Sequence, residues 1–172
     1  MSPRHANLRA VPNKLTGTNL AAYEAGHAVA AVVLRLSLRY VTMRPRGPES
    51  GLTHTREARS ESRDHLERDA VFTLAGIAAD QLISGRVTFG SDAGDIPRAK
   101  GIAERLGVED VQAFVDAKLR EAEAVVSANR AGVEAVRRAL VERRTLQGAE
   151  VRAIVAASGS HFGSQSGRPT RS

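Results

Sequence analysis

The chain of 172 residues contains no cysteine and no tryptophan. The absence of cysteine excludes disulfides, thiolate metal ligands and cysteine nucleophiles, so any metal must be held by His, Asp, Glu or Tyr side chains. Aromatic residues make up only 3% of the sequence, whereas hydrophobic residues make up 42%. The core must therefore be built from Ala, Val, Leu and Ile, a composition that favours packed helices over a β-sandwich.

Long apolar runs are also absent. The longest, Ala28 to Leu34, is far shorter than the about 20 residues that a membrane span requires. The first 15 residues lack the apolar region of a secretory signal. We therefore expect a cytoplasmic protein without a membrane span.

The formal net charge of +6 is concentrated at the two ends of the chain. Residues 1–15 and 158–172 contain basic but no acidic side chains, and the part between them is nearly neutral. A nucleic-acid-binding domain is expected to carry a basic face on its folded part. The charge distribution therefore argues against nucleic-acid binding.

A chain of this length can bury one good core but is short for two domains. We predict one domain over residues 16–157, preceded by a flexible lead-in at 1–15 and followed by a disordered tail at 158–172. The expected fold is mostly α, with one small sheet or hairpin. Helices are predicted over Asn19–Arg35, Ser62–Ile83, Asp95–Leu106, Glu109–Ser127, Arg130–Arg143 and a last short segment at 146–155, and strands over Leu38–Arg44 and Gly51–Thr55.

The residues that point to chemistry lie in the first predicted helix, in the stretch Tyr23-Glu24-Ala25-Gly26-His27. In the zinc motif H-E-x-x-H, two imidazoles at i and i+4 face one metal, and the glutamate takes a proton from metal-bound water. Here Glu24 and His27 keep their places, and Tyr23 stands where the first histidine belongs. Asp95 lies at a predicted helix start, where an N-cap role is a sufficient local explanation.

This stretch and four further segments together resemble the peptidase domain of the FtsH-type ATP-dependent zinc proteases, the M41 metallopeptidases. Residues 23–29 resemble that family's H-E-A-G-H-A-V. Residues 41–47 are similar to its strand and P-R-G turn, 74–85 to its G-G-R-A-A-E-E-L-I-F-G helix, 88–99 to its T-T-G-A-S-N-D-L-x-x-A segment, and 129–148 to its closing helical pair. The resemblance covers about residues 16–157.

The resemblance implies an FtsH-peptidase-like helical fold and peptide-bond hydrolysis by zinc-activated water. It implies zinc ligands at His27 and Asp95, a general base at Glu24, and a third ligand position at Tyr23. The implied substrates are peptides or unfolded proteins. Because the sequence has no G-x-x-x-x-G-K-[ST] phosphate loop, we expect a domain without the family's ATPase and membrane anchor, acting on flexible peptides or beside a partner protein.

The sequence leaves three interpretations of Tyr23. It binds the metal as a phenolate; or Glu24, His27 and Asp95 bind zinc weakly in another geometry; or the site holds no metal and Tyr23 is hydrogen-bonded to His27 or Asp95. His54, on the second predicted strand, is a possible substitute ligand. The alternative function is a catalytically inactive pseudopeptidase that binds peptides or proteins by strand addition.

Overall fold

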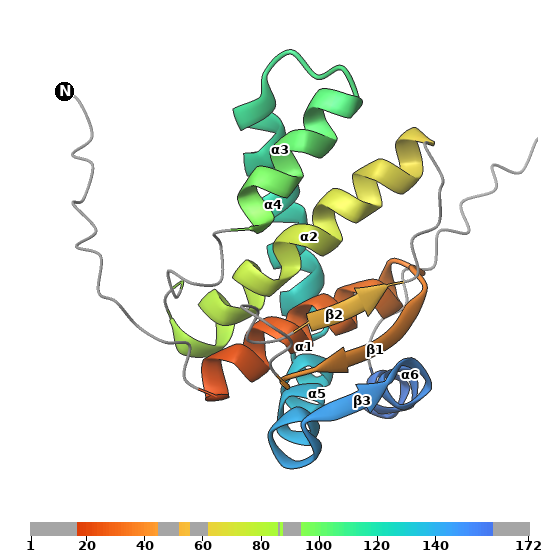
Figure 1. The fold of residues 1–172 in the computed structure, drawn as a ribbon. Coiled ribbons are helices and arrows are strands. Elements are labelled where there is room, and N and C mark those ends of the chain that lie inside the picture. The colour runs from red at the N-terminus through yellow and green to blue at the C-terminus, as the bar shows by residue number, and fades with distance from the viewer. Residues whose placement is uncertain (1–16, 45–51, 56–61, 86, 88–93, 160–172) are drawn as a thin grey trace, which may run out of the picture.

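The computed structural model describes residues 17–44, 52–55, 62–85, 87 and 94–159 (Figure 1). In this part of the chain it contains the helices α1 (Gly17–Val33), α2 (Arg63–Ser84), α3 (Asp95–Arg105), α4 (Val111–Ala128), α5 (Arg130–Arg143) and α6 (Gly148–Ala157), and the strands β1 (Leu38–Thr42), β2 (Leu52–Thr55) and β3 (Thr145–Gln147). The prediction of a mostly helical domain with one small sheet is confirmed. The predicted lead-in and nearly all of the predicted tail lie outside the described residues.

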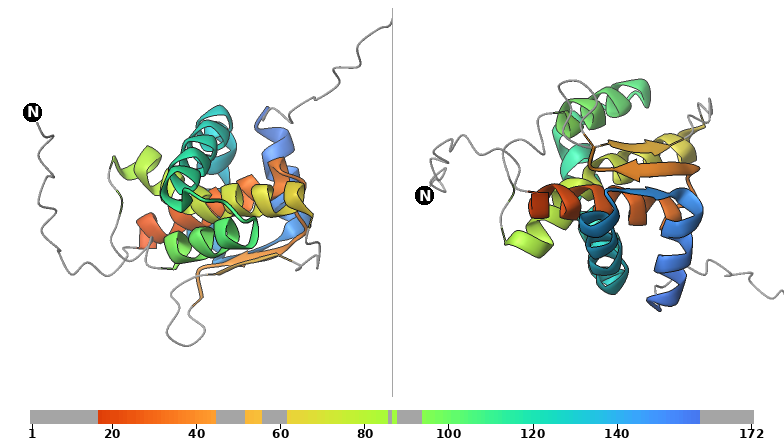
Figure 2. Two further views of the ribbon diagram at one scale, coloured as in Figure 1. Left: turned by 90° about the horizontal axis from the view of Figure 1, so that it is seen from above. Right: turned by 60° about the horizontal axis from the view of Figure 1, so that its bottom comes forward.

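Helix α1 is the centre of the domain. From Leu20 to Val32, every residue is buried except Tyr23, which is half-buried. The helix packs against α2, α4 and α5 and against the strands β1 and β2 (Figures 1 and 2). A helix that is covered on nearly all sides needs small apolar residues, and its alanines and valines meet this need.

The sheet is antiparallel, with the strand order β2-β1-β3. Val41, at its centre, lies opposite Thr53 on β2 and Leu146 on β3. The prediction that residues 146 and 147 begin the last helix is wrong, because they belong to β3 and α6 begins at Gly148. A strand of three residues is too short for apolar and polar positions to alternate visibly, so the pattern gave no sign of it.

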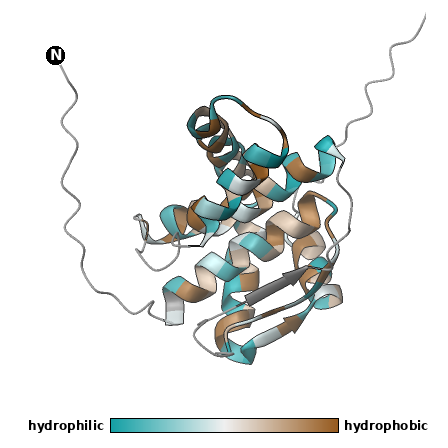
Figure 3. Cartoon of the chain, turned by 45° about the horizontal axis from the view of Figure 1, so that its top comes forward, coloured by the Kyte–Doolittle hydropathy of each residue, from teal (hydrophilic) through white to brown (hydrophobic). Residues whose placement is uncertain are grey.

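The core consists of aliphatic side chains, as the composition predicted. Hydrophobic residues recur along the helices and along β1 (Figure 3). The largest side chains that are fully buried include Leu74, Leu140, Leu146, Val29, Val41 and Val133. None of the helices formed by the described residues is long and apolar enough to cross a membrane.

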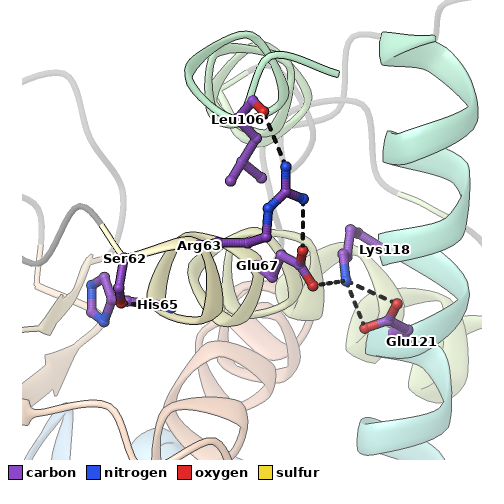
Figure 4. A network of polar contacts seen from close by, with 7 residues as sticks. All are labelled: Ser62, Arg63, His65, Glu67, Leu106, Lys118 and Glu121. Carbon is purple, nitrogen blue, oxygen red and sulfur yellow. Dashed lines mark hydrogen bonds and ion pairs between the residues drawn. The ribbon is translucent and has the colours of Figure 1, made fainter. Parts of the chain in front are cut away.

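A polar network joins α2 to α3 and α4 (Figure 4). Glu67 on α2 accepts hydrogen bonds from Arg63, at 3.2 Å, and from Lys118 on α4, at 3.5 Å. Lys118 also donates to Glu121, at 3.0 Å, and Arg63 donates to the carbonyl oxygen of Leu106 beyond the end of α3, at 3.3 Å. Because only 11% of the Lys118 side chain is exposed, its two carboxylate partners compensate a charge that would be costly to bury alone.

Candidate functional site

Three of the predicted site residues meet in one place. Tyr23 and His27 lie one turn apart on α1, and Asp95 is the first residue of α3. The Tyr23 hydroxyl donates a hydrogen bond to Asp95 Oδ2, and His27 Nε2 lies 3.5 Å from the same oxygen. The helical period places the tyrosine and the histidine on one face, and the packing of α3 on α2 brings the carboxylate to them.

The His27 ring is held on several sides. Its Nδ1 lies 2.9 Å from the carbonyl oxygen of Phe72 on α2. A carbonyl oxygen only accepts hydrogen bonds, so Nδ1 carries a proton and Nε2 is the nitrogen that faces Asp95. The Tyr23 ring meets the imidazole edge to face, with centroids 4.6 Å apart, and the Phe72 ring lies 5.3 Å away.

The pKa of His27 lies above its ordinary value, although burial by itself lowers it. The hydrogen bond and the negative charge of Asp95 raise it, and the charge of Glu24 and the carbonyl of Phe72 raise it further. Acidic neighbours favour the charged imidazolium. The histidine therefore holds its second proton to a higher pH than a free imidazole does.

Glu24 is also part of this region. Only 3% of its surface is exposed, although glutamate is rarely buried in proteins. Its charge contributes to the raised pKa of His27, so the two groups lie within electrostatic range. The role of Glu24 as a general base stays a prediction.

The N-cap interpretation of Asp95 is not what the structure shows. The N-cap of α3 is Gly94, and no side chain makes a capping hydrogen bond there. The Asp95 side chain is instead turned towards α1, with 15% of its surface exposed. Its carboxylate contacts Tyr23 and His27.

Helix α2 closes the site from one side at Gly76. A Cβ atom at this position would lie 2.4 Å from His27 Nε2 and 2.5 Å from Tyr23 Cε2. Such distances are far inside van der Waals contact, so only glycine leaves room for the two rings. Gly76 therefore allows α2 to pack closely against this face of α1.

Sequence reasoning missed the residues that hold α3 in place. Arg98, one turn after Asp95, forms an ion pair with Asp69 on α2, at 3.1 Å, and lies over the Phe72 ring, with its guanidinium carbon 6.0 Å from the ring centroid. Phe72 contributes its carbonyl to His27 and its ring to Arg98. The type of a residue does not show that its backbone carbonyl has a role, so the contact of Phe72 with His27 had no signal in the sequence. The spacing of Asp69, Phe72 and Gly76 at i, i+3 and i+7 does show that they share one face of α2.

One further acid, Asp80, and one further histidine, His54, bear on the composition of the site. Asp80 on α2 is fully buried, and Ser84 donates a hydrogen bond to its carboxylate at 3.0 Å. His54, the possible substitute ligand, belongs to β2, where the structure describes the backbone and not the side chain. Its recruitment to the site stays a prediction.

The side-chain atoms that could bind a zinc ion here match a zinc site only in part. His27 Nε2 and Asp95 Oδ2 are separated by 3.5 Å, close to the roughly 3.3 Å between two ligands of a tetrahedral zinc with bonds of about 2.0–2.1 Å. Within the described ranges, however, no three His, Cys, Asp or Glu side chains form a group that could hold a metal. The third position is a phenol whose proton is directed at Asp95. These residues therefore do not fit the three-ligand zinc site that the resemblance implied.

Comparison with known proteins shows which family and which relatives the chain resembles. A family model described as "Peptidase family M41" matches residues 11–109. The ATP-dependent zinc metalloprotease FtsH 1 of Symbiobacterium thermophilum is 35% identical over 166 residues, and FtsH 4 of Sorangium cellulosum is 29% identical over 181 residues. Each alignment covers 77% of this chain but only 28% of the relative, so the chain spans less than a third of their length.

Proposed function

Because the chain belongs to peptidase family M41, as its motifs predicted, we propose that its domain binds polypeptide segments and that its hydrolytic centre is altered at Tyr23. The observation that carries this proposal is the hydrogen bond from the Tyr23 hydroxyl to Asp95. In this hydrogen bond the phenol of Tyr23 keeps its proton and occupies the carboxylate of Asp95, which the family resemblance assigns to zinc. In this proposal the domain is a pseudopeptidase that retains the polypeptide-binding part of the fold.

The edge of the sheet supports polypeptide binding. Among the described strands, β2 pairs with β1 and has no other strand on its outer side. The free backbone groups of an edge strand can pair with an extended peptide, which then becomes a further strand. Since β2 also contacts α1, a peptide bound there would lie on the side of the domain that carries the candidate site helix.

Peptide hydrolysis is the second candidate function, and Glu24 favours it. This residue is buried next to the oriented imidazole of His27, where the resemblance places a general base. Hydrolysis of the family type would require zinc to be bound by His27 and Asp95 together with a third donor. The phenol of Tyr23 is that donor only if it loses its proton.

Binding and cleavage can be separated in one experiment. A fluorescently labelled, unstructured polypeptide is mixed with the purified protein, with and without zinc, and its anisotropy and fragmentation are followed. We expect binding without cleavage for the wild type. Cleavage that is lost both in Glu24→Gln and on addition of a chelator would establish the second candidate instead. A protein that neither binds nor cleaves would refute both.

The variant Tyr23→His tests the placement of the tyrosine. It restores the H-E-x-x-H pattern, so we expect it to bind zinc more tightly than the wild type in equilibrium dialysis. If the variant folds normally, as judged by circular dichroism, but binds zinc no better, then position 23 is not a ligand position. Asp95→Asn in the Tyr23→His background should remove the gained affinity.

A further inference from the structure

We infer that Tyr23, His27 and Asp95 form a metal-independent clamp, in which the hydrogen bond from the Tyr23 hydroxyl to Asp95, with His27 beside it, takes the structural place of a metal ion and fastens α3 to α1. This inference rests on the proposed alteration of the site and goes beyond it, because it concerns what the altered site does for the fold.

The clamp connects segments that are far apart in the chain. Tyr23 and Asp95 are separated by 72 positions, and their hydrogen bond joins α1 directly to the first residue of α3. His27 Nε2 faces the same carboxylate oxygen from the next turn of α1, at 3.5 Å. Two side chains of one helix thus hold a single carboxylate of another.

The surroundings of the clamp are already closed. Phe72 fixes the far nitrogen of His27, and Gly76 packs so closely that a Cβ atom would lie 2.4 Å from Nε2. The clamp residues are mostly buried, with 8% of the His27 side chain and 15% of the Asp95 side chain exposed. Charge-assisted hydrogen bonds in such a site are stronger than bonds between neutral groups in water.

The clamp adds to another polar contact that holds α3. The ion pair of Arg98 with Asp69 ties α3 to α2, but it is half exposed, since 53% of the Arg98 side chain is accessible. Exposed ion pairs contribute little to stability. The buried clamp should therefore contribute more than this ion pair to the position of the start of α3.

Thermal unfolding with and without zinc tests this inference. We expect the wild type to unfold at the same temperature in excess chelator and in excess zinc. Tyr23→Phe removes only the hydroxyl and should lower the unfolding temperature by about 5–10 °C, irrespective of zinc. Tyr23→His should be destabilised in chelator and recover by about 5–10 °C with zinc. An unfolding temperature of the wild type that rises by several degrees with zinc would overturn the inference.

A spectroscopic test does not depend on the stability of the Tyr23 variants. The chain has only two tyrosines and no tryptophan, so Tyr40→Phe leaves Tyr23 as the single phenol. Near-ultraviolet absorbance of this variant then reports Tyr23 alone. We expect no tyrosinate band when zinc is added at neutral pH, and the appearance of such a band would show a metal-bound phenolate and refute the clamp.

The two proposals fail in different ways. If zinc binds to the wild type but the labelled polypeptide is still bound without cleavage, the clamp is wrong and the polypeptide-binding function stands. If zinc has no effect on stability and no polypeptide is bound, the clamp stands and the proposed function is wrong.

Discussion

Replacing Gly26 by alanine is expected to destabilise the domain, although alanine is the better helix former. Gly26 lies in the middle of α1, where α2 crosses closely. A Cβ atom added there would lie 2.4 Å from the carbonyl oxygen of Ala75 and 2.4 Å from the Cβ atom of Ala79. Neither atom can rotate away, because one belongs to the backbone and the other is fixed to it. The two helices would have to move apart.

The expected magnitude follows from two opposing effects. Glycine in a helix interior costs about 0.5–1 kcal/mol relative to alanine, so Gly26→Ala gains that amount from helix propensity. Overpacking a well-packed core costs about 1–3 kcal/mol or more, and the rigid atoms at this crossing favour the upper end. We therefore expect a net loss of about 2 kcal/mol, which is a large fraction of a typical domain stability of about 5–15 kcal/mol.

The chain offers a matched control in Gly101, which lies within α3. A Cβ atom added at this position meets no atom within 4 Å, so Gly101→Ala should stabilise the domain by about 0.4–1 kcal/mol. Both variants are compared with the wild type by urea unfolding monitored by circular dichroism. The two shifts in midpoint should have opposite signs at an unchanged m-value. A Gly26→Ala variant as stable as the wild type would refute the close crossing of α1 and α2.

Three further predictions concern other parts of the domain. Leu74→Ala in the core should cost about 2–5 kcal/mol in urea unfolding, and a loss below 1 kcal/mol would contradict its complete burial. Ser62→Ala removes the N-cap of α2 and should cost about 1 kcal/mol, whereas an unchanged midpoint would show that the cap is not formed. The pKa of Glu150 lies below its usual value because of the Gln147 backbone N–H and Arg143. The stabilisation of the folded state by Glu150 is therefore present above its unfolded pKa and is lost as the pH falls through its folded pKa. Glu150→Gln lacks this stabilisation, so its unfolding free energy should fall less in acid than that of the wild type. Identical acid titrations of the variant and the wild type would contradict this.

Most of the fold could be predicted because its signals are local. The apolar patterns and end signals of the longer helices gave their positions to within a few residues, and Gly85, just past the predicted end at Ile83, adopts the left-handed conformation that ends α2. The strand β3 was missed because three residues carry no period. The pairing of Val41 with Leu146 depends on contacts between distant parts of the chain, which a local pattern does not contain.

For the site, too, local sequence patterns predict the placement of some residues and not of others. That Tyr23 and His27 share a face follows from the helical period alone. That Asp95 joins them, 72 positions after Tyr23, followed from the family resemblance and not from any pattern in the sequence. The role of the Phe72 carbonyl was beyond sequence reasoning, because it is a backbone atom, and the sequence did not show which side chains the space at Gly76 admits.

The consequence of tyrosine at position 23 can be argued from hydrogen-bonding chemistry. Two neutral imidazoles and one carboxylate can turn three lone pairs towards one point, and such a group needs a cation to hold it together. A phenol brings a proton of its own, so Tyr23 can join Asp95 without a metal. His27 Nε2 faces the same carboxylate oxygen from the next turn of α1, at 3.5 Å. In the proposed clamp, tyrosine in place of histidine at position 23 turns a group that requires a cation into one that a hydrogen bond already satisfies.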